Sequence, residues 1–180
     1  MMNERVTIYG PEDVEKSLRR MSADILRRKE ELPVMVGIRR GGVNVSDRLQ
    51  EIIKELTGEK LKSAIVDINF YRDDWSMARS FPKVGPTQIP FSLEGKRIIL
   101  VDDVLYTGRT VRAALDALSE FGRASSIELA VLVDRGHRQM PIKADYSSFN
   151  FATEFKEIVE VNFTDEGRFG EIVLMSDRKL

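Results

Sequence analysis

Two adjacent carboxylates followed by small hydroxylic residues form the part of this sequence best suited to chemistry. Asp102 and Asp103 come directly after the apolar run 98–101, and the segment 105–110 then supplies two threonines and a glycine. A helix beginning within that segment would present unpaired backbone N–H groups and the positive end of its dipole, which together bind phosphate. Carboxylates repel phosphate, but they accept hydrogen bonds from ribose hydroxyls or hold a hydrated cation. The spacing therefore predicts a sugar-phosphate site, with a polar loop and a threonine helix cap as the plainer alternative.

A second anion-binding segment is predicted at Arg39, Arg40 and Gly41, which follow the apolar run 34–38. Glycine leaves backbone N–H groups accessible, and guanidinium groups match the geometry of phosphate. The alternative is a tight turn with solvated arginines. His137 is the one histidine of the chain and lies in a basic loop. A solvated or RNA-facing side chain is more common there than a general base, so we assign His137 no catalytic role.

These segments require strands that end at a common edge of a sheet. Short apolar runs predict strands at 6–9, 34–38, 64–71, 98–101 and 126–133, and helical patterns run from Pro11 to before Pro33, over 43–56 and over 111–121. The alternation predicts a parallel sheet with right-handed crossovers, in which ligands bind beyond the carboxyl ends of the strands. Three closing strands are predicted at 145–149, 157–163 and 171–175, the last two as a hairpin.

Each predicted helix carries an apolar stripe that should face the core. The stripes are Val14, Leu18, Met21 and Ile25, then Val45, Leu49, Ile52, Ile53 and Leu56, then Val111, Leu115 and Leu118. Gly58 is predicted to end the second helix. The segment 72–90 contains several prolines and glycines without periodicity, which predicts either a functional lid or a disordered connection. Its last residues, from 88, are expected to return to the sheet.

Composition limits the classes of protein to which the chain can belong. Its 180 residues suffice for one domain with a substantial core, so we expect a single domain over 1–180. The formal net charge of −1 gives no overall bias toward nucleic acid, although a local basic face stays open. The absence of cysteine excludes disulfides and thiolate metal sites. No stretch resembles a membrane helix or a signal peptide, so a cytoplasmic protein without membrane contact is expected.

The string from Val101 to Thr110 reads Val-Asp-Asp-Val-Leu-Tyr-Thr-Gly-Arg-Thr. It resembles the phosphoribosyl-diphosphate signature of the type I phosphoribosyltransferases. The exact residues of this string, and those of the string 133–141, are similar to the sequences of one branch of that family. The members of this branch are pyrimidine operon regulators that are also uracil phosphoribosyltransferases. The Gly-Lys-Ser/Thr step of nucleotide P-loops is absent, and the two acids are adjacent rather than spaced as in haloacid-dehalogenase-type phosphatases.

The resemblance extends from the first helix to about Tyr146 and implies an α/β fold of the type I phosphoribosyltransferase kind. In that fold a central, mostly parallel sheet is flanked by helices and carries a small hood and a mobile lid loop. The implied reaction joins uracil to 5-phosphoribosyl 1-diphosphate, giving UMP and diphosphate, with Mg²⁺ bound mainly through the substrate and no metal site of the protein's own. A homo-oligomer, dimeric or larger, is also implied. The implied catalytic residues are Asp102, Asp103 and, from the lid, Arg72; the implied substrate-binding residues are Arg39, Arg40, Gly41, Val104, Leu105, Tyr106, Thr107, Gly108, Arg109, Thr110, Val133, Asp134 and Arg135.

The same branch implies UMP-responsive binding to pyrimidine-operon leader RNA and control of transcription attenuation. Two rivals stay open: an RNA-binding attenuation regulator with vestigial enzyme activity, and a phosphoribosyltransferase for another base. The chain departs from the branch at Ala23, where an imidazole is common, and at Phe149 and Phe155, where lysines are usual. These departures predict weaker or narrower RNA binding than is typical of the branch. The basic candidates for RNA contact are Arg19, Arg27, Arg138 and Lys143.

Overall fold

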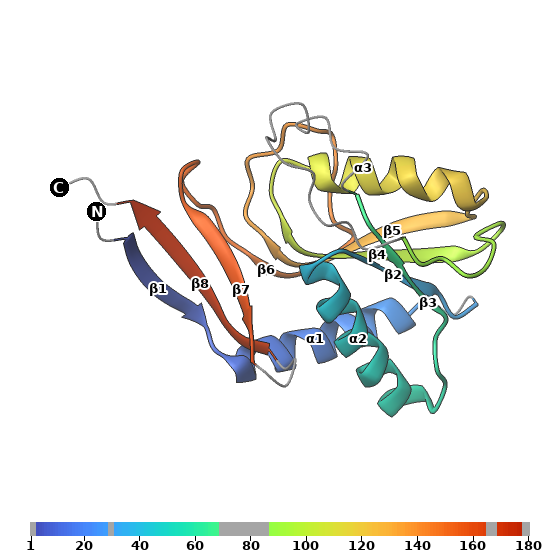
Figure 1. The fold of residues 1–180 in the computed structure, drawn as a ribbon. Coiled ribbons are helices and arrows are strands. Elements are labelled where there is room, and N and C mark those ends of the chain that lie inside the picture. The colour runs from blue at the N-terminus through green and yellow to red at the C-terminus, as the bar shows by residue number, and fades with distance from the viewer. Residues whose placement is uncertain (1–2, 29–30, 69–86, 165–168, 178–180) are drawn as a thin grey trace.

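The computed structural model describes residues 3–28, 31–68, 87–164 and 169–177, and it contains two sheets (Figure 1). The larger sheet is parallel throughout, in the order β3-β2-β4-β5-β6. The smaller sheet, here called the hood, is antiparallel in the order β1-β8-β7. The parallel strands are β2 (Val34–Ile38), β3 (Ser63–Val66), β4 (Arg97–Leu105), β5 (Ser126–Asp134) and β6 (Tyr146–Asn150), and the hood strands are β1 (Asn3–Tyr9), β7 (Ile158–Phe163) and β8 (Phe169–Asp177).

The parallel sheet lies between helices (Figure 1), which are α1 (Pro11–Leu26), α2 (Gly41–Thr57) and α3 (Arg109–Leu118), the last followed by a 3₁₀ turn at Ser119–Phe121. One face packs the apolar stripes of α1 and α2 against alternate side chains of the sheet, such as Met35, Ile99 and Leu132. The opposite face packs α3 against the other set, such as Val36 and Leu100. Such two-sided burial explains why the central strands read as continuous apolar runs.

The hood shares the interior of the larger sheet. Val159, Phe169 and Ile172 belong to the same buried cluster as the stripes of α1 and α2. The hood therefore stands against the side of the parallel sheet that α1 and α2 cover, and it is fixed to that core through β7 and β8. The carboxyl ends of β2, β4 and β5 remain together at one edge, because parallel strands all end on the same side.

Most predicted elements are confirmed, and several boundaries change. The helix that was expected to reach Pro33 ends at Leu26. The predicted strand 98–101 extends to Leu105, because the ladder with β5 continues through the acids: Asp102 pairs with Val131 and Val104 with Val133. The strand predicted over 145–149 is confirmed with a shift of one residue. It is β6, which pairs parallel with β5.

Two apolar side chains of the predicted stripes are exposed rather than buried. Leu56, in the last turn of α2, has an exposed fraction of 55%, and Leu115 has one of 36%. Helix α3 instead buries Val111, Leu118 and three alanines. Gly58 does end α2, as predicted, in the left-handed conformation that favours glycine (φ 76°).

Candidate functional site

The acid pair lies at the carboxyl end of β4, inside the strand. Asp102 is 5% exposed, and its Oδ1 accepts a hydrogen bond from the backbone N–H of Asp103 (3.0 Å). Oδ1 of Asp103 in turn accepts one from the N–H of Val104 (2.9 Å). Burial raises the pKa of Asp102 well above its usual value, and the neighbouring charge of Asp103 raises it further. Asp102 therefore releases its proton less readily than an exposed carboxyl group.

Three glycines bring the start of α2 against this strand end. A Cβ on Gly42 would lie 2.3 Å from the carbonyl oxygen of Val101, and one on Gly37 would lie 2.8 Å from Cα of Val43. No side chain larger than hydrogen fits at either position without displacing backbone. A Cβ on Gly41 would collide with the Asp103 carboxylate itself. The amino end of α2, with its partial positive charge, is thus packed directly onto the acid pair.

The loop after β4 leads straight into a helix, as predicted. Gly108 caps α3 in the left-handed conformation (φ 90°), and Oγ1 of Thr107 accepts a hydrogen bond from the N–H of Arg109 (3.3 Å). A hollow of about 260 Å³ adjoins this loop. Its lining includes one acid of β4 and the first turn of α3. A carboxylate that can accept hydrogen bonds from hydroxyls and the backbone N–H groups of a helix start therefore border one space. The lining residues are Asp102, Val104, Leu105, Tyr106, Thr107, Gly108, Arg109, Thr110 and Val111.

The segment after β5 lies beside this loop, but its arginine side chain is turned toward the protein. Arg135 is 5% exposed, and its N–H donates to the carbonyl of Leu105 (3.1 Å). Its Nε donates to Oγ1 of Thr153 and its Nη2 to the carbonyl of Glu154, both at 3.0 Å. The side chain and the backbone N–H of Arg135 are therefore both engaged within the protein.

Arg138, one of the RNA-binding candidates of the sequence, makes several hydrogen bonds within the protein. Its Nη1 donates to the carbonyls of Tyr106 (2.7 Å), Gly136 (3.1 Å) and Leu105 (3.3 Å). Its Nε donates to the carbonyl of Ile142 (3.0 Å), and its Nη2 pairs with Asp134. Each of the three guanidinium nitrogens therefore donates to at least one group of the protein. Arg138 joins the loop after β4 to the loop after β5.

The predicted arginine pair lies at the same edge of the sheet. Arg40 is exposed and immediately precedes α2, and the peptide bond between Arg39 and Arg40 is cis. The backbone N–H of Arg39 donates to the carbonyl of Val66 (3.0 Å), and its Nε lies 3.6 Å from Oδ2 of the buried Asp67. Arg40, the start of α2 and the acid pair thus border one region. Arg72 and the predicted lid up to residue 86 lie outside the described residues.

The segment from 88 returns to the sheet, as expected. Gln88 and Ile65 form an antiparallel bridge in which each N–H donates to the other carbonyl, at 2.8 and 3.0 Å. Oγ1 of Thr87 also accepts a hydrogen bond from the N–H of Asp67 (3.1 Å). The described end of the predicted lid is therefore attached beside the carboxyl end of β3.

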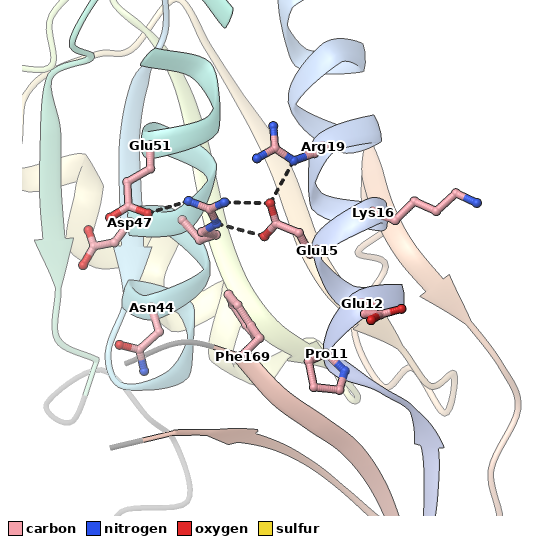
Figure 2. A pocket seen from close by; sticks show the side chains of 10 residues that line it. Pro11, Glu12, Glu15, Lys16, Arg19, Asn44, Asp47, Glu51 and Phe169 are labelled. Carbon is pink, nitrogen blue, oxygen red and sulfur yellow. Dashed lines mark hydrogen bonds and ion pairs between the residues drawn. The ribbon is translucent and has the colours of Figure 1, made fainter. Parts of the chain in front are cut away.

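A larger hollow, of about 1160 Å³, lies between α1 and α2 (Figure 2). Glu15 accepts hydrogen bonds from Arg19 and, with both carboxylate oxygens, from Arg48. Arg19 also pairs with Glu55 at 2.9 Å. Four acidic and three basic side chains line this groove, and it shares no lining residue with the hollow beside β4. Arg19, a predicted RNA contact, is thus already engaged by two carboxylates.

The other two basic candidates are more accessible. The side chain of Arg27, at the end of α1, is 81% exposed and lies 3.5 Å from Asp24. Lys143 is exposed in the loop before β6 and has no ion pair among the residues that the structure describes. Sequence reasoning singled out Phe155 but did not predict the contacts of its segment 151–157, here called the strap, which runs across the loop after β5. The signal in the sequence was the string Phe-Ala-Thr-Glu-Phe, which differs from the usual sequence of the branch at this place.

The parallel sheet with its hood, and the acid pair that precedes a glycine-capped helix, define the type I phosphoribosyltransferase fold. Residues 7–163 match the model of the phosphoribosyl transferase domain. The chain is 46% identical over 178 residues to the bifunctional protein PyrR of Caldicellulosiruptor bescii, covering 96% of this chain and 97% of the relative. It is 48% identical over 170 residues to the bifunctional protein PyrR of Elusimicrobium minutum, covering 93% and 95%.

Among solved structures, a hypoxanthine phosphoribosyl transferase of Trypanosoma cruzi aligns with a TM-score of 0.70 over 95% of this chain and 91% of its own. At 18% identity that likeness concerns the fold alone. The chain belongs to the phosphoribosyltransferase family, in the branch of the bifunctional PyrR proteins. In the described part of the chain, no helix is both long and apolar enough to cross a membrane.

Proposed function

We propose that the protein transfers the phosphoribosyl group of 5-phosphoribosyl 1-diphosphate to uracil, giving UMP and diphosphate, and that it also acts as a UMP-responsive RNA-binding regulator of pyrimidine genes through transcription attenuation. The observation that carries the enzymatic half is the packing of the α2 amino end onto the acid pair Asp102–Asp103, beside the loop 105–110. In this arrangement the two carboxylates, which accept hydrogen bonds from sugar hydroxyls, lie between two groups of backbone N–H donors. Such an order of groups suits a sugar with a phosphate at each end.

Each segment has a separate task in this proposal. Asp102 and Asp103 accept hydrogen bonds from the ribose hydroxyls, and the amides and hydroxyls of 105–110 hold the 5′-phosphate. Arg39, Arg40 and Gly41 hold the diphosphate, with Arg72 added from the lid. The backbone of 133–135 reads the edge of the base. Because all these segments follow parallel strands, a substrate can contact every one of them at a single edge.

The chemistry then requires positioning and charge stabilisation rather than a nucleophilic side chain. The N1 nitrogen of uracil forms a bond to C1 of the ribose while the bond from C1 to the diphosphate oxygen breaks. The bonding electron pair leaves with diphosphate, and the N1 proton is released. Positive charge that develops on the ribose is stabilised by the acid pair, and the donors at the start of α2 stabilise the leaving group. Closure of the lid would exclude water from this centre.

Mg²⁺ fits this site mainly as an ion carried by the substrate. Among the described residues, no group of three or more His, Asp or Glu side chains could hold a metal ion. Mg²⁺ commonly takes one or two carboxylates together with phosphate oxygens and water, and the acid pair and the diphosphate could supply those ligands. When bound, the ion neutralises charge on the departing diphosphate.

The regulatory half is supported by the PyrR relatives, whose names describe them as bifunctional. Among the basic candidates from the sequence, Arg27 and Lys143 are accessible to the RNA backbone, whereas Arg19 is already paired with carboxylates. Fewer available cations mean fewer counterions released on binding, so this pattern supports a reduced rather than an absent affinity for RNA. We further propose a single domain over 1–180, a homo-oligomer and a cytoplasmic site of action.

A panel of bases tests the enzymatic proposal. The wild-type protein should release diphosphate from the phosphoribosyl donor with uracil in the presence of Mg²⁺, and much more slowly with cytosine, hypoxanthine or guanine. Faster turnover with a purine than with uracil would show that the substrate is a purine base. No turnover with any base, in a protein that binds leader RNA, would leave regulation as the function.

A further inference from the structure

A buried carboxylate lies beside the segment to which the proposed function assigns the diphosphate. Asp67 directly follows β3 and is 3% exposed. Its Oδ2 lies 3.6 Å from Nε of Arg39, and both atoms are buried. The reaction proposed above gives Asp67 no task. Burial of a carboxylate is costly unless a cation lies nearby, so the pairing with Arg39 is the first place to look for its role.

The backbone around Asp67 is fixed on both sides. The N–H of Asp67 donates to Oγ1 of Thr87 (3.1 Å), and the hydroxyl of Thr87 donates to the carbonyl of Asp67 (3.4 Å). The preceding residue, Val66, belongs to β3, and its carbonyl accepts a hydrogen bond from the N–H of Arg39 (3.0 Å). The following residue, Ile68, is buried. Asp67 is therefore held firmly at the end of β3, and Arg39 is attached to the same place through its own backbone.

The guanidinium group of Arg39 has one side toward the protein and one side toward the solvent. Its Nε is buried beside Asp67, but the side chain as a whole is 28% exposed, so other atoms of the side chain reach the solvent. A guanidinium contacted at Nε keeps two terminal nitrogens with four N–H donors, in the planar arrangement that matches phosphate oxygens. A distance of 3.6 Å is longer than a hydrogen bond, but opposite charges attract one another over it where water is excluded.

We propose that Asp67 is a positioning residue for diphosphate binding, which holds Arg39 at Nε and directs the terminal nitrogens of its guanidinium toward the diphosphate. The inference rests on the proposed function, which places the diphosphate at Arg39, Arg40 and Gly41. A long side chain that is oriented before the ligand arrives loses less conformational freedom on binding. Charge alone predicts the opposite effect, because a carboxylate near an anion site repels the anion. The two effects of Asp67 therefore differ in sign, and a binding measurement shows which one prevails.

Calorimetric titration with inorganic diphosphate and Mg²⁺ tests this role without relying on turnover. Asp67→Asn keeps the shape of the side chain and removes its charge. We expect the variant to bind diphosphate about tenfold more weakly, an effect within the range for groups that act in one network. The KM for the phosphoribosyl donor should rise by a similar factor, and the KM for uracil should stay unchanged, because the base contacts a different segment.

Glu128→Gln is the matched control. It also removes a buried carboxylate charge that pairs with an arginine. Its partner, Arg97, is the first residue of β4 and lies at the opposite end of that strand from the acid pair. The control should therefore lose stability while its affinity for diphosphate stays close to that of the wild type. An equal loss of affinity in the control would mean that any broken buried ion pair weakens the site, and this would overturn the proposal.

Two variants of Arg39 test whether Asp67 acts through this arginine. Arg39→Gln should weaken diphosphate binding, and adding Asp67→Asn in that background should cause no further loss. Arg39→Lys provides the test if Asp67→Asn does not fold. Lysine keeps the charge but has a single ammonium group, which cannot contact Asp67 and present a planar pair of nitrogens to diphosphate at the same time. Arg39→Lys should therefore bind diphosphate about as weakly as Arg39→Gln.

Three results would overturn the role of Asp67. These are a diphosphate affinity of folded Asp67→Asn equal to or higher than that of the wild type, a full further loss in the Arg39→Gln background, and wild-type affinity in Arg39→Lys. A different result would contradict the transferase reaction alone: a wild-type protein whose diphosphate binding depends on Asp67 in this way but which transfers no base.

Discussion

A Cβ atom on Gly41 would lie 1.9 Å from Oδ2 of Asp103 and 2.3 Å from its Cγ. The first residue of α2 and the second acid of β4 therefore occupy space that admits no extra methyl group. Gly41 serves the site through this contact as well as through any backbone N–H it offers to a ligand. The relationship connects the diphosphate segment to the ribose-binding acids, and it leads to a direct test.

Gly41→Ala should displace the Asp103 carboxylate and lower kcat/KM by about 10²-fold, because a misplacement of about 1 Å can cost that much in catalysis. Stability should fall less than activity, since the clash is with the end of a side chain rather than with backbone. Steady-state kinetics and thermal unfolding measure the two effects. Gly170→Ala is the control, because a Cβ there would be no closer than 3.4 Å to its neighbours. Normal kinetics in Gly41→Ala would show that the position of Asp103 is unimportant.

The double variant Asp102→Asn, Asp103→Asn should lose transferase activity by at least about 10²-fold while remaining folded, because preorganised charge at the reacting centre contributes on that scale. Diphosphate release measures the activity, and circular dichroism the fold. Asparagine has nearly the shape of aspartate, so the packing around Gly42 is preserved. Near-normal turnover in the folded variant would refute the role of the acid pair.

The single variant Asp102→Asn should be more stable than wild type at neutral pH. The pKa of Asp102 is raised in the folded state above 3.8, so the stability that it contributes in its protonated form is lost as pH rises through the folded pKa. Asparagine does not ionise and avoids that loss. Denaturant unfolding at pH 3.5 and pH 7.5 should show a gain only at the higher pH. If the variant and the wild type differed in unfolding free energy by the same amount at both pH values, burial of the Asp102 charge would be contradicted.

Glu128 should give the opposite pH dependence. Arg97 donates to both of its carboxylate oxygens, at 2.8 and 3.0 Å, and these bonds together with one from Tyr146 lower the pKa of Glu128 from 4.5 to about 2. Its contribution is present above pH 4.5 and is lost as pH falls toward 2. The free energy of unfolding of wild type should therefore decrease over that range, and Glu128→Gln should flatten the decrease.

Glu128→Gln should also cost about 3–5 kcal/mol at pH 7, because it leaves the guanidinium of Arg97 buried beside a neutral partner. Both side chains are only 5% exposed. Replacing both residues, as in Arg97→Met with Glu128→Leu, should recover much of that loss, since a well-packed apolar pair often substitutes for a buried ion pair. If the double variant were as unstable as the single one, the unpaired charge would not be the cause.

Lys143 and Arg19 should differ in their effect on RNA binding. Lys143→Gln should reduce the slope of log affinity against log salt by roughly 0.7–0.9, the value for one phosphate contact. Arg19→Gln should change it less, because Arg19 is paired with Glu15 and Glu55. Titration of a pyrimidine-operon leader hairpin at two salt concentrations, with and without UMP, provides the measurement. Nanomolar, UMP-enhanced binding by the wild type with a steep slope would contradict the expected reduction and make regulation the primary function.

Local sequence was informative wherever a short signal determines structure. The strand that ends in Asp102, the glycine that ends α2 and the helix that begins after Gly108 all follow from neighbouring residues. The remaining differences depend on contacts between distant segments. Nothing near Arg138 in the sequence reveals that carbonyls 32 and 33 residues away, those of Tyr106 and Leu105, accept its hydrogen bonds. Periodicity alone could not show which strand β6 would pair with, and the structure pairs it with β5.

The pairing of β1 with β8 has a consequence for how the chain is made. Thr7 on β1 and Glu171 on β8, which share a hydrogen bond, are 164 residues apart. During synthesis β1 leaves the ribosome early and has no strand partner until nearly all the rest of the chain has followed. The parallel sheet can assemble first around α1 and α2, and the hood is added last, so the nascent chain passes through a stage with an unpaired strand edge.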